Sequence, residues 1–579
     1  MALTLPFPRS SRSLGETARL AAGVLGRGMW RAVRVVIWPI IWQVPLFAII
    51  FWAALNPAVR LMPLPSVPEQ DMGHFRLWVA WLGANGVEAA YAGLFPAQYI
   101  IYPPLSPYFY YLVAQLIAAM PAPPPLLQPL WPTDGHWFEA VVRAPVVLFH
   151  GLLTAVIYWS TVRWKGHLAA IAASLFYAAN PAVLFDLVYW AQPDSYHSFF
   201  AVVGLLLLLG RWPELGWAAF ALAALAKPQA WIYLPVLLLF TWRRHGFGKV
   251  LSGGVFFLVT AVALLWPYIA AGRGWEMASV FVNFSRVMPV VTANAHNLWW
   301  LILGQPGLFK ADSAIFLGPF SYQTVGFVLL LIGYTAALMK TLGDGDRETL
   351  FSAAGFMSLW FFLFSTQIHE NHAFLVFPML AMCWPASARL FAVFLILTLT
   401  MFGNLAMHDP ILEPQMPSLI AQYTPEWLPR PLAEWATMER LMLLGTWLNF
   451  LALAIWFSTF IWRWRSRPVP AWERQRRAGW GAAVGGTAAL AAAALALVLV
   501  LSPPSPAAPA RAPDSLLDGR ISLKPVEEPY LRITLGGGGT TDPNALRLQT
   551  IFTALGGALA VACVSLGYAS YQGLARNRR

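Results

Sequence analysis

The chain alternates between long apolar runs and short polar segments. A membrane-spanning helix needs about 20 consecutive apolar residues, and runs of roughly this length recur from one end of the sequence to the other. Several of them are short and are expected to be kinked. We therefore predict an all-α polytopic membrane protein with about 14 transmembrane helices. The predicted segments are 35–56, 141–162, 167–185, 196–210, 214–226, 229–242, 250–270, 321–339, 350–366, 373–385, 389–404, 441–462, 480–501 and 551–571.

The composition agrees with this prediction and excludes other classes. Of 579 residues, 58% are hydrophobic and only 11% are charged, whereas soluble domains carry about 25% charged residues. A disordered chain would be polar and rich in charge, and two cysteines cannot form a disulfide framework. The run 36–52 lacks the short apolar core and small-residue cleavage site of a signal peptide. It is expected to be the first spanning helix.

The distribution of charge predicts an orientation. With the N-terminus placed in the cytoplasm, the inner segments hold 24 of the 38 Lys and Arg residues but only 6 of the 26 acidic residues. Cytoplasmic loops of membrane proteins carry such an excess of cations, so both termini are expected inside. The net charge of +12 then orients the chain in the membrane, and we expect no nucleic-acid partner.

Three of the predicted outer segments are long, namely 57–140, 271–320 and 404–440. The first contains two aromatic and apolar runs with helical spacing, 75–91 and 106–120. Amphipathic helices rich in Trp and Tyr lie along membrane surfaces, so we expect interfacial helices there.

Four regions follow from this organisation. The Pro/Ala-rich and Gly-rich stretch 503–550 is expected to be an outer loop without a site, and no internal repeat is obvious. The regions are a basic cytoplasmic N-terminus (1–34), a catalytic transmembrane module (35–410), an outer loop with one helix and a basic cytoplasmic loop (411–479), and a C-terminal helix pair (480–579).

Polar clusters near the predicted outer ends of the helices are candidate functional groups, because ionisable residues at membrane depth are costly. Asp71 precedes Arg76 and Trp78 soon after the first helix. A carboxylate is favoured at a helix N-terminus, so Asp71 could equally be a simple N-cap. Tyr102 precedes two prolines that suit a helix start, which could also be only a rigid turn.

Three further clusters follow along the chain. Trp190, Gln192 and Asp194 occupy a tight outer turn, which could instead be an aromatic belt with ordinary loop acids. Lys227 and Gln229 interrupt two apolar half-runs. A lysine at such a break serves an anion or a cavity, unless it snorkels to the membrane surface.

His369 and Glu370 follow the apolar segment that ends at Ser365, and they suit phosphate binding unless the loop only caps a helix. His369 and His372 lack the spacing of a zinc motif, so no metal is expected. The stretch with Asn294 and Asn297 combines amides with tryptophans. It would suit a sugar or a headgroup, or else form an interfacial belt.

Together these clusters resemble the GT-C membrane glycosyltransferases, in particular the dolichyl-phosphate-glucose glucosyltransferases of asparagine-linked glycosylation and their bacterial relatives. The resemblance covers about 35–410. It rests on the Asp71-Arg76-Trp78 spacing, on the Tyr-Pro-Pro-Leu run 102–105, on the turn 190–195, on the Lys-Pro-Gln break, on the Asn-Leu-Trp stretch 297–299 and on the His369-Glu370 pair. Two positions depart from the family pattern: Ile101 replaces an acid and Ala191 replaces a glycine.

The resemblance implies a GT-C fold and an inverting transfer of a hexose, such as glucose or mannose, from a polyprenyl-phosphate donor to an extracytoplasmic lipid- or glycan-linked acceptor. An inverting displacement needs a base for the acceptor hydroxyl, and Asp71 is the candidate. The leaving phosphate needs cationic and hydrogen-bonding groups, for which His369, Lys227 and Arg76 are the candidates. No cofactor is implied. The expected substrate-binding residues are Trp78, Tyr102, Trp190, Gln192, Asp194, Gln229, Asn294, Asn297 and Glu370.

Two alternatives stay open. A transporter or lipid flippase would place ionisable groups at mid-membrane and often shows repeated halves, whereas here the polar groups gather on one predicted face. A non-catalytic relative of the enzyme fold is suggested only by Ile101. The composition favours a bacterial plasma membrane with the site facing outward, or the endoplasmic reticulum membrane if the source is eukaryotic.

Overall fold

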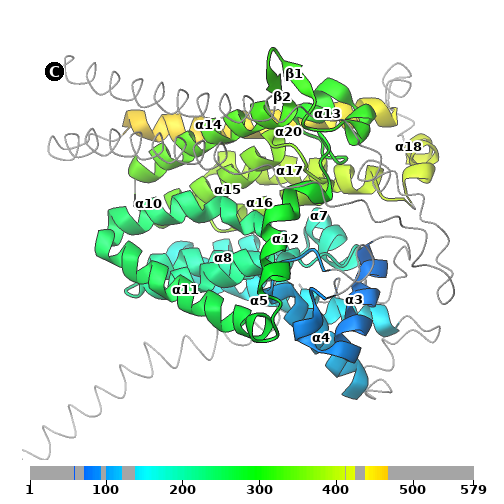
Figure 1. The fold of residues 1–579 in the computed structure, drawn as a ribbon. Coiled ribbons are helices and arrows are strands. Elements are labelled where there is room, and N and C mark those ends of the chain that lie inside the picture. The colour runs from blue at the N-terminus through cyan, green and yellow to red at the C-terminus, as the bar shows by residue number, and fades with distance from the viewer. Residues whose placement is uncertain are drawn as a thin grey trace, which may run out of the picture. The chain divides into compact units, whose positions relative to one another are not determined.

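The structure is a computed structural model that describes Ala58 and residues 71–92, 100–119, 137–343, 345–410, 412–423 and 437–466. These residues all belong to one unit, Ala54–Arg579. The described part is mostly helical, with one antiparallel hairpin formed by β1 (Ile315–Leu317) and β2 (Phe320–Ser321) (Figure 1). The predicted all-α class is therefore confirmed apart from this short hairpin.

Every predicted apolar segment that falls on described residues contains a helix. The segments 35–56, 480–501 and 551–571, and the loop 503–550, lie outside the described residues. The corresponding helices are α5 (Trp137–Lys165), α6 (His167–Ala178), α8 (Asp194–Leu208), α9 (Pro213–Ala226), α10 (Leu234–His245), α11 (Phe247–Ala270), α14 (Tyr322–Gly343), α15 (Arg347–Phe364), α16 (Val376–Ala381), α17 (Ala388–Met407) and α20 (Met438–Ser466).

Five of these helices, among the described residues, are long and apolar enough to cross a membrane: α5, α11, α14, α17 and α20. A sixth candidate is the pair formed by α6 and the segment Pro181–Tyr189, which is bent by 44°. The helices α8 and α9 are apolar but shorter. These helices agree with a membrane protein. The total of about 14 spans stays a prediction.

The first long outer segment forms the expected helices. They are α3 (Asp71–Asn85), the short 3₁₀ turn η2 (Val87–Ala89) and α4 (Leu105–Ala119). Phe75 and Trp78 of α3 bury their rings against Tyr110 of α4, with centroids 5.4 Å apart in each pair. Helix α4 also packs against α5 and α9. The pair α3–α4 is therefore held on the helical body, and its position at the membrane surface stays a prediction.

Two predicted helices are broken, and polar groups gather at the breaks. Asn180 caps the short helix α7 (Pro181–Leu184) by accepting the backbone N–H groups of Ala182 and Val183. The π-helical turn η4 (Phe185–Tyr189) follows it and carries Asp186. Isolated π turns often occur at functional sites. The segment 229–242 likewise begins as a 3₁₀ turn, η5 (Pro228–Tyr233), before α10.

The remaining elements connect and cover this body. Helix α12 (Gly274–Val287), helix α13 (Leu298–Leu303) and the 3₁₀ turn η6 (Gln305–Phe309) lie between α11 and the hairpin. The 3₁₀ turns η7 (Glu370–Leu375) and η8 (Trp384–Ala386) flank α16. The turn η9 (Glu413–Gln415) and helix α18 (Met416–Tyr423) precede α20.

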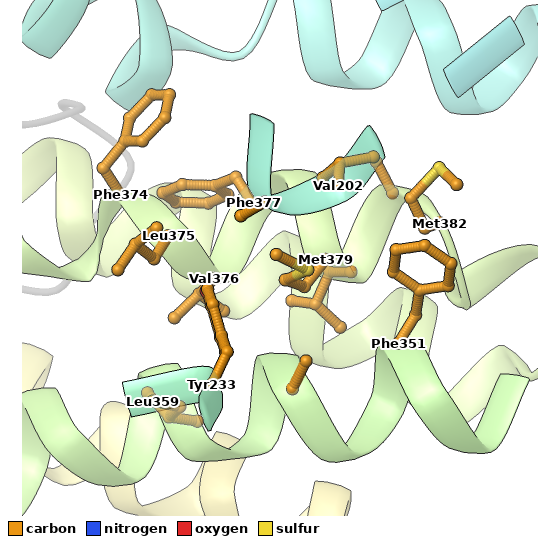
Figure 2. Packing of buried hydrophobic residues seen from close by; sticks show 14 of the residues in the cluster. Val202, Tyr233, Phe351, Leu359, Phe374, Leu375, Val376, Phe377, Met379 and Met382 are labelled. Carbon is orange, nitrogen blue, oxygen red and sulfur yellow. The ribbon is translucent and has the colours of Figure 1, made fainter. Parts of the chain in front are cut away.

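The core is centred on α15 and α16. Figure 2 shows side chains of η7 and α16, among them Phe377 and Met379, together with Phe351 of α15, Val202 of α8 and Tyr233 of η5. Tyr233 and Ser358 share a hydrogen bond of 2.7 Å. By contrast α11 leaves most of its large apolar side chains exposed. Exposed apolar side chains on α11 and buried ones on α15 are expected of an outer and an inner helix in a membrane bundle.

Candidate active site

The ends and breaks of seven elements bring most of the predicted site residues together. Asp71 begins α3, and Tyr102 lies just before α4. The turn between η4 and α8 carries Gln192 and Asp194. Lys227 separates α9 from η5. His369 and Glu370 lie at the start of η7.

The Asp71 carboxylate is exposed and is held by a buried amide. Gln192 Nε2 donates a hydrogen bond to Asp71 Oδ2, and Gln192 itself is only 1% exposed. This contact joins residues that are 121 positions apart in the chain. The side chain of Asp71 is thus fixed by a tertiary contact, beyond the N-cap role that its sequence position alone would suggest, and one carboxylate face stays open to solvent.

Lys227 and Asp194 form a buried ion pair. Lys227 Nζ lies 2.7 Å from Asp194 Oδ1, and the residues are 3% and 2% exposed. Lys227 has an extended backbone, with φ −150°, because α9 ends there. The ammonium group therefore does not reach the surface as a snorkelling lysine would. Taking two charges out of water costs free energy that close pairing has to offset, so this pair is an unusual feature of the interior.

His369 and Glu370 complete the group. Loss of hydration lowers the pKa of the His369 imidazole to about 4, and Lys227 acts in the same direction while Asp71 opposes it. Loss of hydration also raises the pKa of Glu370 to about 8. Within the described residues Glu370 Oε2 has no hydrogen-bond partner. At neutral pH the site therefore holds a neutral imidazole and a protonated carboxyl group that can donate a hydrogen bond.

Electrostatic coupling links these groups into one cluster. The Asp71 charge acts on His369, Glu370 and Tyr102, and the Lys227 charge acts on His369. Loss of hydration, and then the charges of Asp71 and Asp194, raise the pKa of the Tyr102 hydroxyl well above its usual value. Lys227 Nζ also lies 5.9 Å from the centre of the Tyr102 ring. Residues that the sequence spreads over 300 positions thus share one electrostatic environment.

Backbone anchors fix the Tyr102 segment. Tyr91 donates its hydroxyl hydrogen bond to the Tyr102 carbonyl at 2.9 Å, and Tyr268 donates to the Pro104 carbonyl at 2.9 Å. Ser106 donates to the Ala226 carbonyl at 2.6 Å, next to Lys227. These contacts fix the proline-containing segment before α4 against α9 and α11.

Other predicted residues lie at the edge of this cluster. Trp78 packs edge-to-face on Tyr102, with centroids 5.5 Å apart. Trp190 Nε1 donates to Asp409 Oδ2 at 2.8 Å. Arg76 is electrostatically coupled to Arg143 of α5. The predicted roles of Trp78 and Trp190 in substrate binding and of Arg76 in phosphate binding stay predictions.

Two of the three predicted amide residues have identifiable structural partners. Asn297 caps α13, because its side-chain oxygen accepts the backbone N–H groups of Trp299 and Trp300 at 3.0 Å. The Asn294 carbonyl accepts from Asn404 Nδ2 at 2.7 Å. Gln229 is buried, and its Oε1 has no hydrogen-bond partner among the described residues. Substrate binding by all three also stays a prediction.

Strained backbone marks the same region. Among the described non-glycine residues, positive φ angles occur at Ala191 (60°), Asn294 (62°) and Gln367 (62°). Ala191 directly precedes Gln192. Asn294 pairs by a β-bridge with His369, which follows Gln367 by two positions. Residues held in such conformations cluster at functional sites in proteins, so the three angles point to the same place as the polar contacts.

Several other groups have no predicted role in the site. Asp186 is buried in η4 and electrostatically coupled to Asp194 and Lys227. His197 lies one turn after Asp194, and this i, i+3 spacing on a helix could have indicated it. A buried pair, His296 and His408, has its Nε2 atoms 3.2 Å apart. No group of three or more His, Cys, Asp or Glu residues in the described ranges is arranged to hold a metal ion.

Comparison with known proteins gives only a weak structural likeness. No protein-family model matches the chain, and no curated protein matches it either. One similar solved structure is that of ArnT from Cupriavidus metallidurans bound to undecaprenyl phosphate. The two chains are 16% identical with a TM-score of 0.39, and the match covers 78% of this chain and 80% of that one. A likeness of this strength assigns no family.

Proposed function

We propose that this protein is an integral-membrane glycosyltransferase that moves a hexose from a polyprenyl-phosphate donor to an extracytoplasmic acceptor with inversion. The observation that carries the proposal is that the charges of an exposed carboxylate, Asp71, and of a buried ammonium group, Lys227, both act on the half-buried imidazole of His369. The motif resemblance to GT-C enzymes supports the same function. The site would face outward, in a bacterial plasma membrane.

Asp71 is the proposed general base. The acceptor hydroxyl attacks the anomeric carbon from the side opposite the phosphate, and a carboxylate must take its proton as the new bond forms. Asp71 is exposed, so an acceptor can reach it, and Gln192 fixes its orientation. A carboxylate held by one amide keeps a second oxygen available for the proton.

Lys227 and His369 are the proposed phosphate ligands. As the bond between the anomeric carbon and the phosphate oxygen breaks, its electron pair moves to that oxygen, and preorganised donors stabilise the added charge. Lys227 supplies a fixed positive charge and His369 an N–H donor, with Arg76 as a further cation. No metal ion is needed in this scheme, because the ammonium group carries the positive charge.

The neighbouring groups would orient the sugar. Glu370, protonated below a pH of about 8, can donate to a sugar oxygen. Trp78 and Tyr102 supply aromatic surfaces next to Lys227. We expect further contacts with the sugar or the headgroup from Trp190, Gln192, Asp194, Gln229, Asn294 and Asn297.

The test is transfer of radiolabelled sugar from a polyprenyl-phosphate donor by the full chain in liposomes that contain a lipid extract as acceptor. Asp71→Asn keeps the shape of the side chain but removes the base. The rate of sugar transfer by this variant should fall by at least about 100-fold, the usual contribution of general base catalysis. Asp346→Asn is the matched control, since Asp346 caps α15 and asparagine caps equally well. Full activity of Asp71→Asn would overturn the base assignment, whereas ion-driven uptake without transfer would favour a transporter.

A further inference from the structure

The hairpin formed by β1 and β2 turns an apolar face outward. Ile315 and Leu317 of β1 are each 62% exposed, and Phe309 of the preceding turn η6 is 53% exposed. Side chains two positions apart on a strand point to the same face, so Ile315 and Leu317 lie side by side. Large apolar side chains that gather on an exposed face mark a surface that contacts a protein or a membrane. The hairpin is therefore a candidate contact surface.

The opposite face of the hairpin is packed against the rest of the fold. Phe316 points to this side, and its ring lies against the rings of Trp299 and Tyr322, with centroids 5.6 Å and 4.6 Å away. Trp299 is fully buried and donates from Nε1 to the Phe364 carbonyl at 3.0 Å. The exposed side chains on the outward face thus belong to a strand that is held in place from its inner side.

The base of the hairpin is tied to the segment that leads to the candidate active site. Asp312 comes just before β1 and is 2% exposed. Its Oδ2 atom accepts hydrogen bonds from Thr366 Oγ1 at 3.1 Å and from Gln367 Nε2 at 2.7 Å. His369 follows two positions after Gln367. A contact that holds the hairpin therefore also constrains the position of this segment.

The hairpin lies at the end of a helix that can span a membrane. β2 ends at Ser321 and α14 begins at Tyr322, and α14 is long and apolar enough to cross a membrane. No charged residue occurs between Ser313 and Met339, so the hairpin and the helix form one uncharged stretch. Figure 1 shows the hairpin projecting to one side of α14 instead of continuing along its axis. This position is where α14 enters the membrane, and the outward face points away from the bundle at that level.

The residues next to the hairpin suit a boundary between lipid and water. Lys310 is half-buried, and its Nζ lies 5.0 Å from the centre of the Tyr322 ring. Lysine and tyrosine at a membrane surface keep their apolar parts toward the acyl chains and their polar ends at the headgroups. The nearest acidic residue in the chain, Asp312, is buried. The outward face therefore carries no negative charge that phosphate headgroups would repel.

A lipid surface fits this face better than a protein partner. Stable protein interfaces take about 20–30 residues from each side, whereas Ile315, Leu317 and Phe309 form a much smaller surface. A membrane gains from burying a few apolar side chains beside a cation. Ile332, further along α14, is also exposed, as expected of a side that faces lipid. The outward face of the hairpin thus continues the apolar surface of the span.

We propose that the β1–β2 hairpin is a membrane anchor whose Ile315 and Leu317 side chains insert among phospholipids where α14 enters the membrane, with Lys310 at the level of the phosphate headgroups. This inference is independent of sugar transfer and requires only that α14 spans the membrane. Through Asp312 the anchor holds the segment before His369 at a fixed depth.

Spin labels on the hairpin test the anchor. The full chain is reconstituted in liposomes of phosphatidylcholine and phosphatidylglycerol, after Cys383→Ala and Cys563→Ala have removed the native cysteines. Ile315→Cys or Leu317→Cys then carries a nitroxide. The rate of its collisions with oxygen, which concentrates among acyl chains, is compared with that of its collisions with a water-soluble nickel chelate. Oxygen should collide more often than the chelate at both positions.

Two reference positions calibrate the measurement. Val259→Cys labels an exposed apolar position in α11 and should give the same order as the hairpin. Lys165→Cys labels an exposed charged residue at the end of α5 and should give the opposite order.

Three results would overturn the inference. A higher collision rate with the chelate at both hairpin positions would place the face in water. Low collision rates with both reagents would mean that protein covers the face. Spin–spin broadening between labelled copies would identify that protein as a second copy of the chain.

Discussion

Lys227 and Asp194 form a buried ion pair across the breaks of two helices, with Lys227 Nζ 2.7 Å from Asp194 Oδ1. Lys227 ends α9 and Asp194 begins α8, so the pair ties together the two elements that carry the phosphate and sugar candidates. A buried pair contributes little net stability, but removing one partner leaves an uncompensated charge. This asymmetry makes it possible to separate a structural role from a catalytic one.

Lys227→Met should destabilise the protein by about 3–5 kcal/mol, since Asp194 is left buried without its cation. Thermal unfolding in detergent measures this loss. The double variant Lys227→Met/Asp194→Leu removes both charges and should recover most of the stability. If Lys227 binds the phosphate, the stable double variant will still lack sugar transfer. A double variant with both wild-type stability and wild-type activity would show that the pair has no part in catalysis.

Gln192→Glu should shift the pH dependence of transfer. The substitution places a second carboxylate against Asp71 in place of the amide that donates to it. A nearby negative charge raises the pKa of a carboxyl group, so the base would become protonated at a higher pH than in the wild type. The acidic limb of the rate profile should therefore move to higher pH.

The rate at saturating donor, measured between pH 5 and pH 9, tests this shift. Gln192→Met removes the hydrogen bond without adding charge and serves as the control. It should lower the rate without the same shift. Identical profiles for Gln192→Glu and the wild type would mean that Asp71 is not the titrating base.

The amino-acid sequence predicts the helices well and the site in part. Apolar run length was sufficient to place α5, α11 and α17 within a few residues, because a helix in lipid must satisfy its own backbone. The motif resemblance located Asp71, Lys227 and His369, which the fold brings together.

Other features depend on tertiary structure and could not be read from the sequence. The hydrogen bond from Gln192 to Asp71 spans 121 positions, and no local pattern encodes such a partner. The bend at Asn180 and the π turn at Asp186 interrupt a run that looks continuous by hydropathy. The Asn297 side-chain oxygen caps α13, a contact that depends on where the helix begins.

Ala191→Gly should stabilise the protein modestly. Ala191 is buried and has a φ of 60°, in the left-handed region that favours glycine. An L-residue there costs roughly 1–2 kcal/mol, while glycine in exchange loses about 0.5–1 kcal/mol of chain entropy. The net gain in the free energy of unfolding is thus expected to be up to about 1.5 kcal/mol, measured by chemical or thermal unfolding.

The same exchange within a helix provides the control for this prediction. Ala219 lies in the interior of α9, where glycine costs about 1 kcal/mol relative to alanine. Ala219→Gly should therefore destabilise the protein while Ala191→Gly stabilises it. Equal losses in the two variants would contradict the strain assigned to position 191.

Glu370 should make both activity and stability depend on pH. Its pKa in the folded protein is raised to about 8 by loss of hydration, compared with about 4.3 for an unperturbed glutamate. The stability that the protonated group contributes is fully present below the pKa of the unfolded state, and it is lost as the pH rises through about 8.

If the protonated carboxyl group of Glu370 donates to the sugar, the rate of transfer should fall over the same pH range. Glu370→Gln keeps a donor that does not titrate, so this variant should retain transfer above pH 8 and show a flatter dependence of melting temperature on pH. A variant that loses activity at the same pH as the wild type would show that another group sets the alkaline limb, and an unchanged melting profile would contradict the raised pKa of Glu370.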